Sequence, residues 1–234
     1  MKISIHTDIT EIPGQQWNKL VKDNHPFIRH EFLAALESCG CVGEKFGWLP
    51  KHIAIYEQGQ LVAAMPLYEK HNSYGEFVFD NAWADAYARH DLRYFPKLVS
   101  AIPYTPVTGQ RLLVKMGLES ELLPVLFDTA MELARSMGAS GLHWLFPQPP
   151  EQAFLQKQAD ILVRHDCQFH WRNRDYQSFD EFLAELTPKK RKNIRQERRK
   201  VQQSGVTFRC LDGYQATAAD WADFNGFYQQ NTRA

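Results

Sequence analysis

The residues best suited to chemistry gather in one stretch of the sequence, from Gly75 to Val114. Asp80, Asp85 and Tyr87 lie close together in it and carry polar groups that are costly to bury without partners. A carboxylate can accept a proton from an attacking group, and a phenol can donate one to a leaving group. We therefore take Asp80 and Asp85 as candidate proton acceptors and Tyr87 as a candidate proton donor.

The same stretch holds aromatic and cationic side chains suited to a pocket wall. These are Trp83, Tyr94, Lys97 and Tyr104. A structural interpretation remains open beside this one, in which a strand at 76–79, an irregular aromatic-rich loop and a second strand over about 98–114 only fill the core. The sequence shows no recognisable Ser-His-Asp or Cys-His nucleophile motif. This favours direct attack by a group of the substrate over a covalent enzyme intermediate.

A second candidate site lies in a basic run, residues 189–200, which holds eight basic residues and one acidic residue. The chain as a whole has 27 of each, so the remainder is net acidic. Thr187-Pro188 predicts the start of a helix whose free amides lie beside the first cations. We expect a phosphate-bearing ligand at Lys190, Arg191 and Arg195. The alternative is a solvated surface helix.

Two further groups invite a functional interpretation. His30 and Glu31 begin a predicted helix and are candidate substrate-binding residues, with a capping role as the alternative. His165, Cys167 and His170 are of metal-ligating types, but no second ligand pair stands at zinc spacing. We therefore expect no metal site.

Composition places the chain among ordinary globular proteins. Of its 234 residues, 44% are hydrophobic and 23% are charged. The N-terminal residues alternate polar and apolar types, unlike a signal peptide. No apolar run approaches the roughly 20 residues of a membrane helix. The expected compartment is the cytoplasm.

Periodicity predicts a series of strands and helices that would position these residues. Strands are expected at 1–8, 141–146 and 167–173, and a hairpin pairs 52–56 with 61–68 around a turn at 57–60. Pro66 cannot donate a ladder hydrogen bond, so it should lie at an edge or a bulge. Helices are expected at 13–24, 30–38, 121–137 and 151–163.

A second unit is predicted from about residue 166 onward. Its expected elements are a helix over 178–186, the basic helix, a strand at 206–211 and a helix at 218–230. The last helix carries Trp221, Phe224 and Phe227, with little chain after it to cover them. We expect these aromatic side chains to form an exposed apolar patch or a homodimer contact.

Several local motifs of this sequence are similar to those of the uncharacterised FemAB-like proteins labelled peptidoglycan biosynthesis or recognition, within the GNAT acyltransferase superfamily. The matching segments are 26–27, 30–37, 47–52, 75–80, 83–87, 94–98 and 103–109. The resemblance covers nearly the whole chain. It implies an α/β (α+β) fold with a GNAT-like mixed sheet flanked by helices over 1–165. Residues 166–234 would then begin a second, incomplete GNAT-like domain.

The resemblance also implies an acyl- or aminoacyltransferase that acts on an amine, with a small molecule or cell-wall precursor as substrate. The GNAT phosphate signature, Gln or Arg, two residues, Gly, one residue, then Gly or Ala, is absent near 108–122, where Gly109-Gln110-Arg111 is a poor substitute. Fem-type enzymes take the acyl group from aminoacyl-tRNA, so acyl-CoA and aminoacyl-tRNA are both candidate donors. The rival hypothesis is a non-catalytic module that binds peptidoglycan fragments or nucleic acid.

Overall fold

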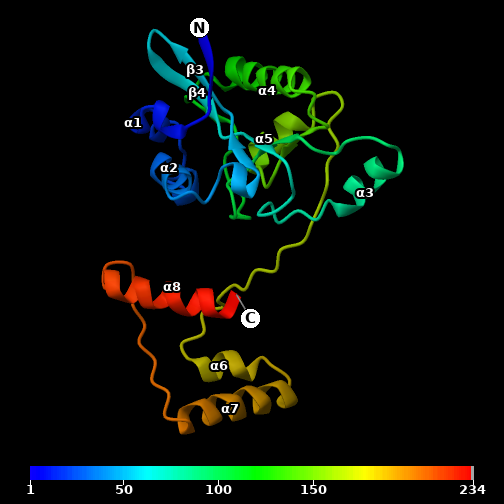
Figure 1. The fold of residues 1–234 in the computed structure, drawn as a ribbon. Coiled ribbons are helices and arrows are strands. Elements are labelled where there is room, and N and C mark those ends of the chain that lie inside the picture. The colour runs from blue at the N-terminus through cyan, green and yellow to red at the C-terminus, as the bar shows by residue number, and fades with distance from the viewer. Residues whose placement is uncertain (233–234) are drawn as a thin grey trace. The chain divides into compact units, whose positions relative to one another are not determined.

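The computed structural model describes residues 1–232 and divides the chain into two compact units, Met1–His165 and Asp166–Ala234. The first unit is a mixed α/β structure with two four-stranded sheets (Figure 1). One sheet has the order β1-β3-β4-β7 and the other the order β2-β5-β6-β8.

The first sheet is antiparallel throughout and is built around a hairpin. It contains β1 (Lys2–His6), β3 (His52–Glu57), β4 (Gln60–Met65) and β7 (Leu113–Val114). The turn between β3 and β4 holds Gln58 and Gly59 at positive φ, as a two-residue hairpin turn requires. This confirms the predicted hairpin and its turn.

Helices cover both faces of this sheet (Figure 1). Successive residues of a strand point to opposite faces. Ile53 and Ile55 therefore pack with α4 (Glu119–Ser136), and Ala54 packs with the opposite helical layer. That layer consists of η1 (Ile9–Glu11), α1 (Gly14–Asn18), η2 (Pro26–Ile28) and α2 (His30–Ser38), and Trp17 is its largest buried side chain. The predicted helix at 30–38 is confirmed, whereas the one at 13–24 is shorter than expected.

The chain passes from the first sheet to the second at Pro66. The predicted strand 61–68 is in fact two strands, β4 and β5 (Tyr68–Lys70), which belong to different sheets. Pro66 has no N–H for a ladder, and its carbonyl accepts a hydrogen bond from Ser100 Oγ at 2.9 Å. The proline thus lies between strands rather than at an edge within one.

The second sheet is mixed and carries the residues of the candidate site. It comprises β2 (Trp48–Pro50), β5, β6 (Lys97–Ser100) and β8 (Leu142–Trp144), with β6 and β8 parallel. η3 (Glu44–Phe46) precedes β2, and α5 (Pro149–Leu155) follows β8. The predicted helix at 151–163 therefore begins earlier and ends sooner, and the predicted strand 98–114 is replaced by β6 and β7 in separate sheets.

The stretch between β5 and β6 differs from its prediction. Residues 76–79 form no strand, and the expected irregular loop contains a helix, α3 (Asn81–Arg89). The ion-pairing and hydrogen-bonding of Glu76 and Asp80 explain the absent strand, because both side chains turn inward and break the alternation that their sequence suggests. We call residues 71–80 the strap.

Arg111 holds the irregular segment between the two sheets. Its guanidinium donates to the carbonyl oxygens of Val107, Gln110 and Leu145, each at 2.8 Å. Glu151 accepts from the N–H groups of Arg111 and Leu112 at 2.9–3.0 Å. Burial lowers the pKa of Arg111 to about 10 and raises that of Glu151 to about 7. Both charges therefore serve to complete backbone hydrogen bonding in the core.

The second unit is helical in the residues that the structure describes. It contains α6 (Phe179–Ala184), α7 (Pro188–Gln203) and α8 (Ala218–Thr232). The strands predicted at 167–173 and 206–211 are wrong, since both segments are described without strand pairing. An isolated strand leaves its ladder groups unpaired, and neither segment has a neighbouring strand in its unit.

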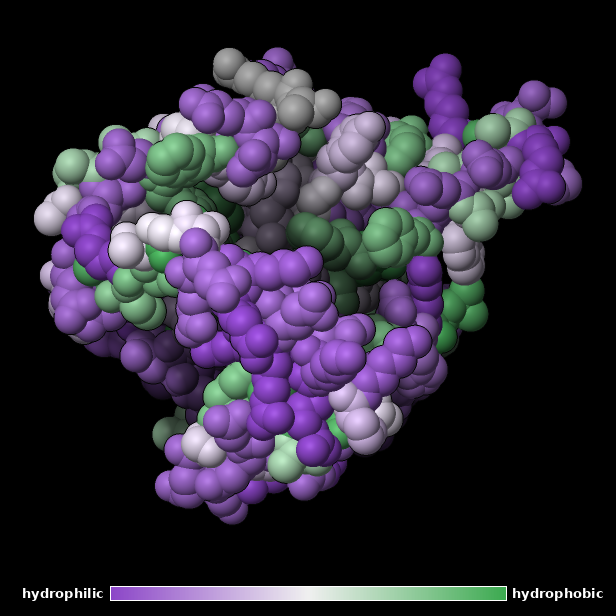
Figure 2. Space-filling view, turned by 90° about the horizontal axis from the view of Figure 1, so that it is seen from below, coloured by the Kyte–Doolittle hydropathy of each residue, from purple (hydrophilic) through white to green (hydrophobic). Residues whose placement is uncertain are grey.

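Hydrophobic side chains also reach the surface of the molecule. Figure 2 shows a face on which hydrophilic side chains predominate and hydrophobic ones lie in separate patches between them. In the second unit Trp221, Phe224 and Phe227 are 58%, 63% and 65% exposed. The homodimer contact through them stays a prediction.

Candidate active site

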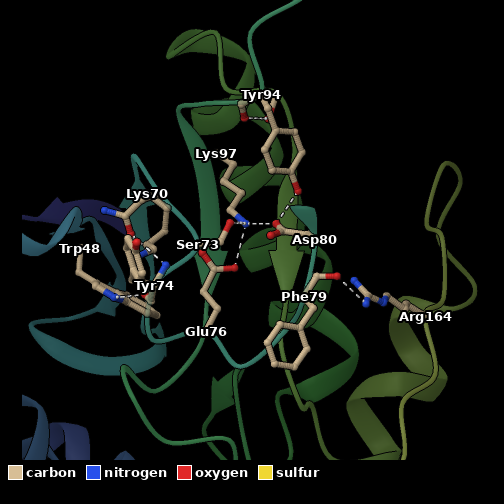
Figure 3. Close-up of polar contacts among 12 residues, drawn as sticks. Trp48, Lys70, Ser73, Tyr74, Glu76, Phe79, Asp80, Tyr94, Lys97 and Arg164 are labelled. Atoms are coloured by element: carbon tan, nitrogen blue, oxygen red, sulfur yellow. Dashed lines mark hydrogen bonds and ion pairs between the residues drawn. The ribbon is translucent and has the colours of Figure 1, made fainter. Parts of the chain in front are cut away.

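A cluster of buried charges lies on one face of the second sheet, under the strap. Lys70 on β5 and Lys97 on β6 are directly opposite each other in the strand register, and both are fully buried. Like charges at opposed positions destabilise a sheet unless they are compensated. The strap supplies the compensation, as Figure 3 shows.

Lys97 forms ion pairs with both buried carboxylates of the strap, Glu76 and Asp80 (Figure 3). Its ammonium donates to Glu76 Oε2 at 2.8 Å, to Asp80 Oδ2 in a shorter contact, and to Ser73 Oγ at 3.5 Å. Glu76 and Asp80 are each 2% exposed. Two ion pairs in a buried environment tie the irregular strap to the rigid strand β6.

Tyr94 completes this cluster from the residues before β6. Its hydroxyl donates to Asp80 Oδ2 at 2.6 Å. Burial raises the pKa of Asp80, but hydrogen bonds from Lys97, Ser73 and Tyr94 outweigh that effect and lower it to about 2. Burial and the bond to Asp80 raise the pKa of Tyr94. Asp80 is therefore a carboxylate, and Tyr94 a neutral phenol, throughout the neutral range.

Glu76 shares the same lysine but titrates differently. Burial raises its pKa above the usual range, and the attraction of Lys97 only partly opposes this. It accepts one hydrogen bond from Lys97, whereas Asp80 accepts from both Lys97 and Tyr94. The two carboxylates of one cluster therefore have pKa values shifted in opposite directions, the pattern seen where two acids have different roles.

Lys70 anchors the other end of the strap. Its ammonium donates to Tyr74 O at 3.1 Å and lies 3.8 Å from the centre of the Trp48 ring, a cation–π contact. The Trp48 indole N–H donates to the same carbonyl at 2.9 Å. Burial lowers the pKa of Lys70 to about 7, with the carboxylate of Glu76 acting in the opposite direction.

Gly75 fits closely between this anchor and the segment after β6. Its φ is +78°, and a Cβ at this position would lie 2.5 Å from the Tyr104 ring. Tyr104 N–H donates to Gly75 O at 3.1 Å. A side chain at residue 75 would therefore displace the strap or the tyrosine.

His143 approaches the cluster from β8. Its ring lies 6.4 Å from that of Tyr94, edge to face. Burial lowers the pKa of His143 to about 4, and the charge of Lys97 adds to this effect. The imidazole is neutral near pH 7, so it adds no further positive charge beside the two lysines.

The structure brings together some of the residues that the sequence nominated. Asp80, Tyr94 and Lys97 are in direct contact, and the Tyr87 ring lies 5.2 Å from that of Tyr94. The Tyr87 hydroxyl donates to Ser140 O at 3.5 Å. Asp85 and Trp83 are exposed on α3, and Trp83 is 49% accessible.

Other nominated residues lie in different parts of the chain. His30 donates its amide N–H to Asn18 Oδ1, and Glu31 accepts from Asn18 Nδ2, so both residues join α1 to α2. Tyr104 lies against Trp48, with ring centres 5.9 Å apart, and its hydroxyl donates to Cys41 O. These contacts give His30 and Glu31 a packing role between α1 and α2, and substrate binding by them stays a prediction.

The basic helix α7 makes specific contacts within its own unit. Arg191 donates to the carbonyl oxygens of Leu183, Ala184 and Leu186 at the end of α6. Arg195 forms an ion pair with Asp180 at 2.9 Å. Lys190 is exposed, and a surface cavity of about 550 Å³ runs along the helix. Its lining residues are Pro188, Arg191, Lys192, Arg195, Gln196 and Arg199.

Sequence reasoning missed Lys70, Glu76 and His143 as members of the cluster. The usable signal was a charge that follows an apolar run, since Lys70 lies two residues after the segment Leu61–Tyr68. Cross-strand register was needed to place Lys70 opposite Lys97, and sequence periodicity does not define it.

Within residues 1–232, no helix is both long enough and apolar enough to cross a membrane.

A search of curated protein sequences finds no match to this chain. Solved structures with a similar fold include a ribosomal-protein-alanine N-acetyltransferase from Brucella melitensis biovar Abortus 2308, with 10% identity, a TM-score of 0.43, and coverage of 74% of this chain and 100% of that chain.

Two other acetyltransferases show the same degree of similarity. One is the aminoglycoside 6'-N-acetyltransferase of Acinetobacter haemolyticus, with 11% identity, a TM-score of 0.45, and coverage of 74% of this chain and 99% of that chain. The other is an acetyltransferase of Trypanosoma brucei, with 12% identity, a TM-score of 0.40 and the same two coverages. The sequence itself matches a family described as peptidoglycan biosynthesis/recognition over residues 8–234, and the chain therefore belongs to the FemAB-like family.

Proposed function

We propose that the protein transfers an acyl or aminoacyl group from an activated ester or thioester to an amine, with a peptidoglycan precursor as the substrate. Membership of a family described by peptidoglycan biosynthesis/recognition supports the substrate class. The observation that carries the reaction is the buried cluster around Lys97, in which two carboxylates of one strap meet a single ammonium. Such preorganised charge is what stabilises charge development during amine attack on a carbonyl.

In this proposal Asp80, Asp85 and Tyr87 are the catalytic candidates. Asp80 stays ionised, because its pKa is about 2, so its role is to orient Lys97 and Tyr94 rather than to take a proton. Tyr87 packs against Tyr94 at the same end of the cluster. Trp83, Tyr94, Lys97 and Tyr104 form the proposed pocket wall.

For the second unit taken by itself, we propose that α7 contacts a phosphate-bearing ligand. Arg191 and Arg195 are already engaged with α6 and Asp180, so they position the helix. Lys190, Lys192 and Arg199 make no hydrogen bond or ion pair among the described residues, and the last two line the cavity along α7. These three cations supply the anion attraction that a diphosphate or a tRNA backbone requires.

The decisive experiment offers acyl-CoAs and aminoacyl-tRNAs as donors and nucleotide-linked muropeptides as acceptors, and measures the amide product by mass spectrometry. We expect one donor class to give product, and Tyr87→Phe to reduce the rate at least tenfold with an unchanged melting temperature. Asp80→Asn should reduce the rate as well, and it should also lower the melting temperature, because Asp80 is a buried ion-pair partner of Lys97. Asp91→Asn, an exposed residue just after α3, is the matched control and should keep wild-type activity.

A binding module without transferase activity is the second candidate. It is favoured by the burial of Glu76, Asp80 and Lys97, none of which is more than 2% exposed. Precursor binding without product from any donor would support this candidate and refute the transferase.

Replacing Lys190, Lys192 and Arg199 with glutamine tests the anion contact. If tRNA is the ligand, affinity should fall with salt by roughly 0.7–0.9 log units per log of salt for each phosphate contacted.

A further inference from the structure

The carboxylate of Glu76 is buried with only half of its acceptor capacity used. Its Oε2 binds Lys97, whereas no described group donates to its Oε1. A buried polar atom without a partner is unfavourable by the desolvation that it suffers, and native structures contain few of them. The cluster therefore lacks a hydrogen-bond donor at this atom.

Asp80 shows the same pattern on the other side of Lys97. Its Oδ2 accepts from Lys97 and Tyr94, whereas its Oδ1 is buried without a partner among the described residues. Both carboxylates come from one strap and contact one ammonium, that of Lys97. The vacancy on each is for a donor, because an ionised carboxylate only accepts hydrogen bonds.

We propose that Glu76 and Asp80 form the subsite for the acceptor amine, and that Glu76 takes the proton that this amine releases. The inference rests on the proposed acyl transfer and names its acceptor site. A primary amine has the N–H donors that both vacant oxygens lack. It also carries the nucleophilic lone pair that acyl transfer needs.

The reaction balances with Glu76 as the proton carrier. The amine nitrogen attacks the acyl carbonyl carbon, and a C–N bond forms while the bond from that carbon to the leaving oxygen or sulfur breaks. The proton from nitrogen moves to Glu76 Oε1 and then passes to the leaving group. The products are an amide and a free alcohol or thiol, and the carboxylate is regenerated.

The surrounding groups shift the pKa values of the two carboxylates in opposite directions and so give them different roles. Asp80 accepts hydrogen bonds from Lys97, Tyr94 and Ser73 and has a pKa of about 2, so it holds the amine without taking its proton. Burial raises the pKa of Glu76, which suits it as a proton acceptor. The other titratable or charged groups that act on the pair are Lys70 on β5, Lys97 on β6 and Tyr94, while His143 on β8 feels the charges of Lys97 and Asp80.

The strap provides the access that a buried subsite needs. Residues 71–80 belong to no helix or strand, so their movement breaks no ladder of the sheet. Tyr74 and Phe79 are 79% and 77% exposed while Glu76 and Asp80 point inward. Figure 3 shows the Phe79 ring directed away from Lys97, and Arg164 donates to Phe79 O at 2.8 Å.

The test measures amine binding in the full chain without an acyl donor, so it is independent of the transfer assay. Thermal unfolding is followed with propylamine and with tetramethylammonium at equal ionic strength, because the latter is a cation without N–H donors. We expect propylamine to raise the melting temperature of the wild type and of the Asp91→Asn control, and tetramethylammonium to have no effect. Glu76→Gln and Glu76→Asp should both lose the propylamine shift.

Glu76→Asp keeps the charge beside Lys97 and covers the case in which the glutamine variant fails to fold. In addition, carboxyl NMR of the ¹³C-labelled wild type should show the Glu76 titration move on addition of propylamine. An unchanged Glu76 titration, an equal shift in Glu76→Asp, or an equal effect of tetramethylammonium would each overturn the subsite. Amine binding at Glu76 without any amide product would overturn the proposed transferase and leave the subsite standing.

Discussion

Lysine and arginine are used in opposite ways in the two units of this chain. In the first unit Lys70 and Lys97 are fully buried and are matched by groups of one short strap. In the second unit the basic residues of α7 are mostly exposed, and Glu197 is the one acid among residues 189–200. Buried charges fix geometry because each depends on a particular partner, whereas exposed charges act at a distance and are screened by salt.

The two units also differ in how much hydrophobic core they contain. The first unit has three clusters of buried hydrophobic residues, whereas Leu183 is the one buried hydrophobic residue that the structure describes in the second. A substitution in the first unit therefore disturbs a dense core, and one in the second mainly disturbs local contacts. This difference sets the size of the effects expected below.

Removing the ammonium of Lys97 should have the largest effect. Lys97→Met leaves Glu76 and Asp80 buried without their shared cation, and we expect a loss of about 3–5 kcal/mol in the free energy of unfolding. Lys192→Met, on the cavity-lining face of α7, should change it by no more than about 0.5 kcal/mol. Urea denaturation of both variants measures the contrast. Equal losses would show that burial of the charge is not what separates the two regions.

Acidification should destabilise the first unit through His143. Its pKa is about 4 in the folded protein, below its unfolded value, so the unfolded chain takes up a proton that the folded one does not. The stability that the neutral ring contributes is complete above pH 6.5 and is lost as the pH falls toward 4. The loss is at most about 3 kcal/mol. His143→Gln should flatten this part of the pH–stability curve, and an unchanged slope in the variant would contradict the assignment.

The smallest effect is expected at the junction of α6 and α7. Arg191→Met leaves three carbonyl groups at the end of α6 without their donor, and these groups can turn to water. We expect about 1 kcal/mol of local destabilisation. Hydrogen exchange should therefore quicken at the α6 and early α7 amides, whereas Arg199→Met should leave it unchanged. A global change in exchange, including β3 and β4, would mean that the two units are more tightly coupled than this comparison holds.

The strongly periodic parts of the fold were predictable. The helix at 30–38, the hairpin of β3 and β4 and the main length of α4 follow directly from apolar spacing and turn residues. The strands at 167–173 and 206–211 were not, because short apolar alternations count as strands only when a partner strand exists. Pro66 explains one further discrepancy, since it divides the predicted strand 61–68 between two sheets.

The site was predictable in part for a related reason. Asp80, Tyr94 and Lys97 stood out because polar groups within an apolar stretch need partners, and the structure shows them as partners of one another. Lys70 and Glu76 required the register of β5 against β6 and the path of the strap. Arg191 and Arg195 were expected to grip an anion together, but the pattern gave no sign of Asp180 or of the carbonyl groups of α6.

The hydrogen bonds of Arg111 should protect the neighbouring irregular segment from proteolysis. The segment 101–112 contains no helix or strand, which ordinarily marks a site of cleavage. Its carbonyl groups at Val107 and Gln110 are held by the guanidinium of Arg111, and the amides of residues 111 and 112 are held by Glu151. A protease must draw several residues into an extended form, and these bonds prevent that. Proteolytic cleavage should therefore occur first within the exposed residues 162–175, and the irregular segment 101–112 should remain intact.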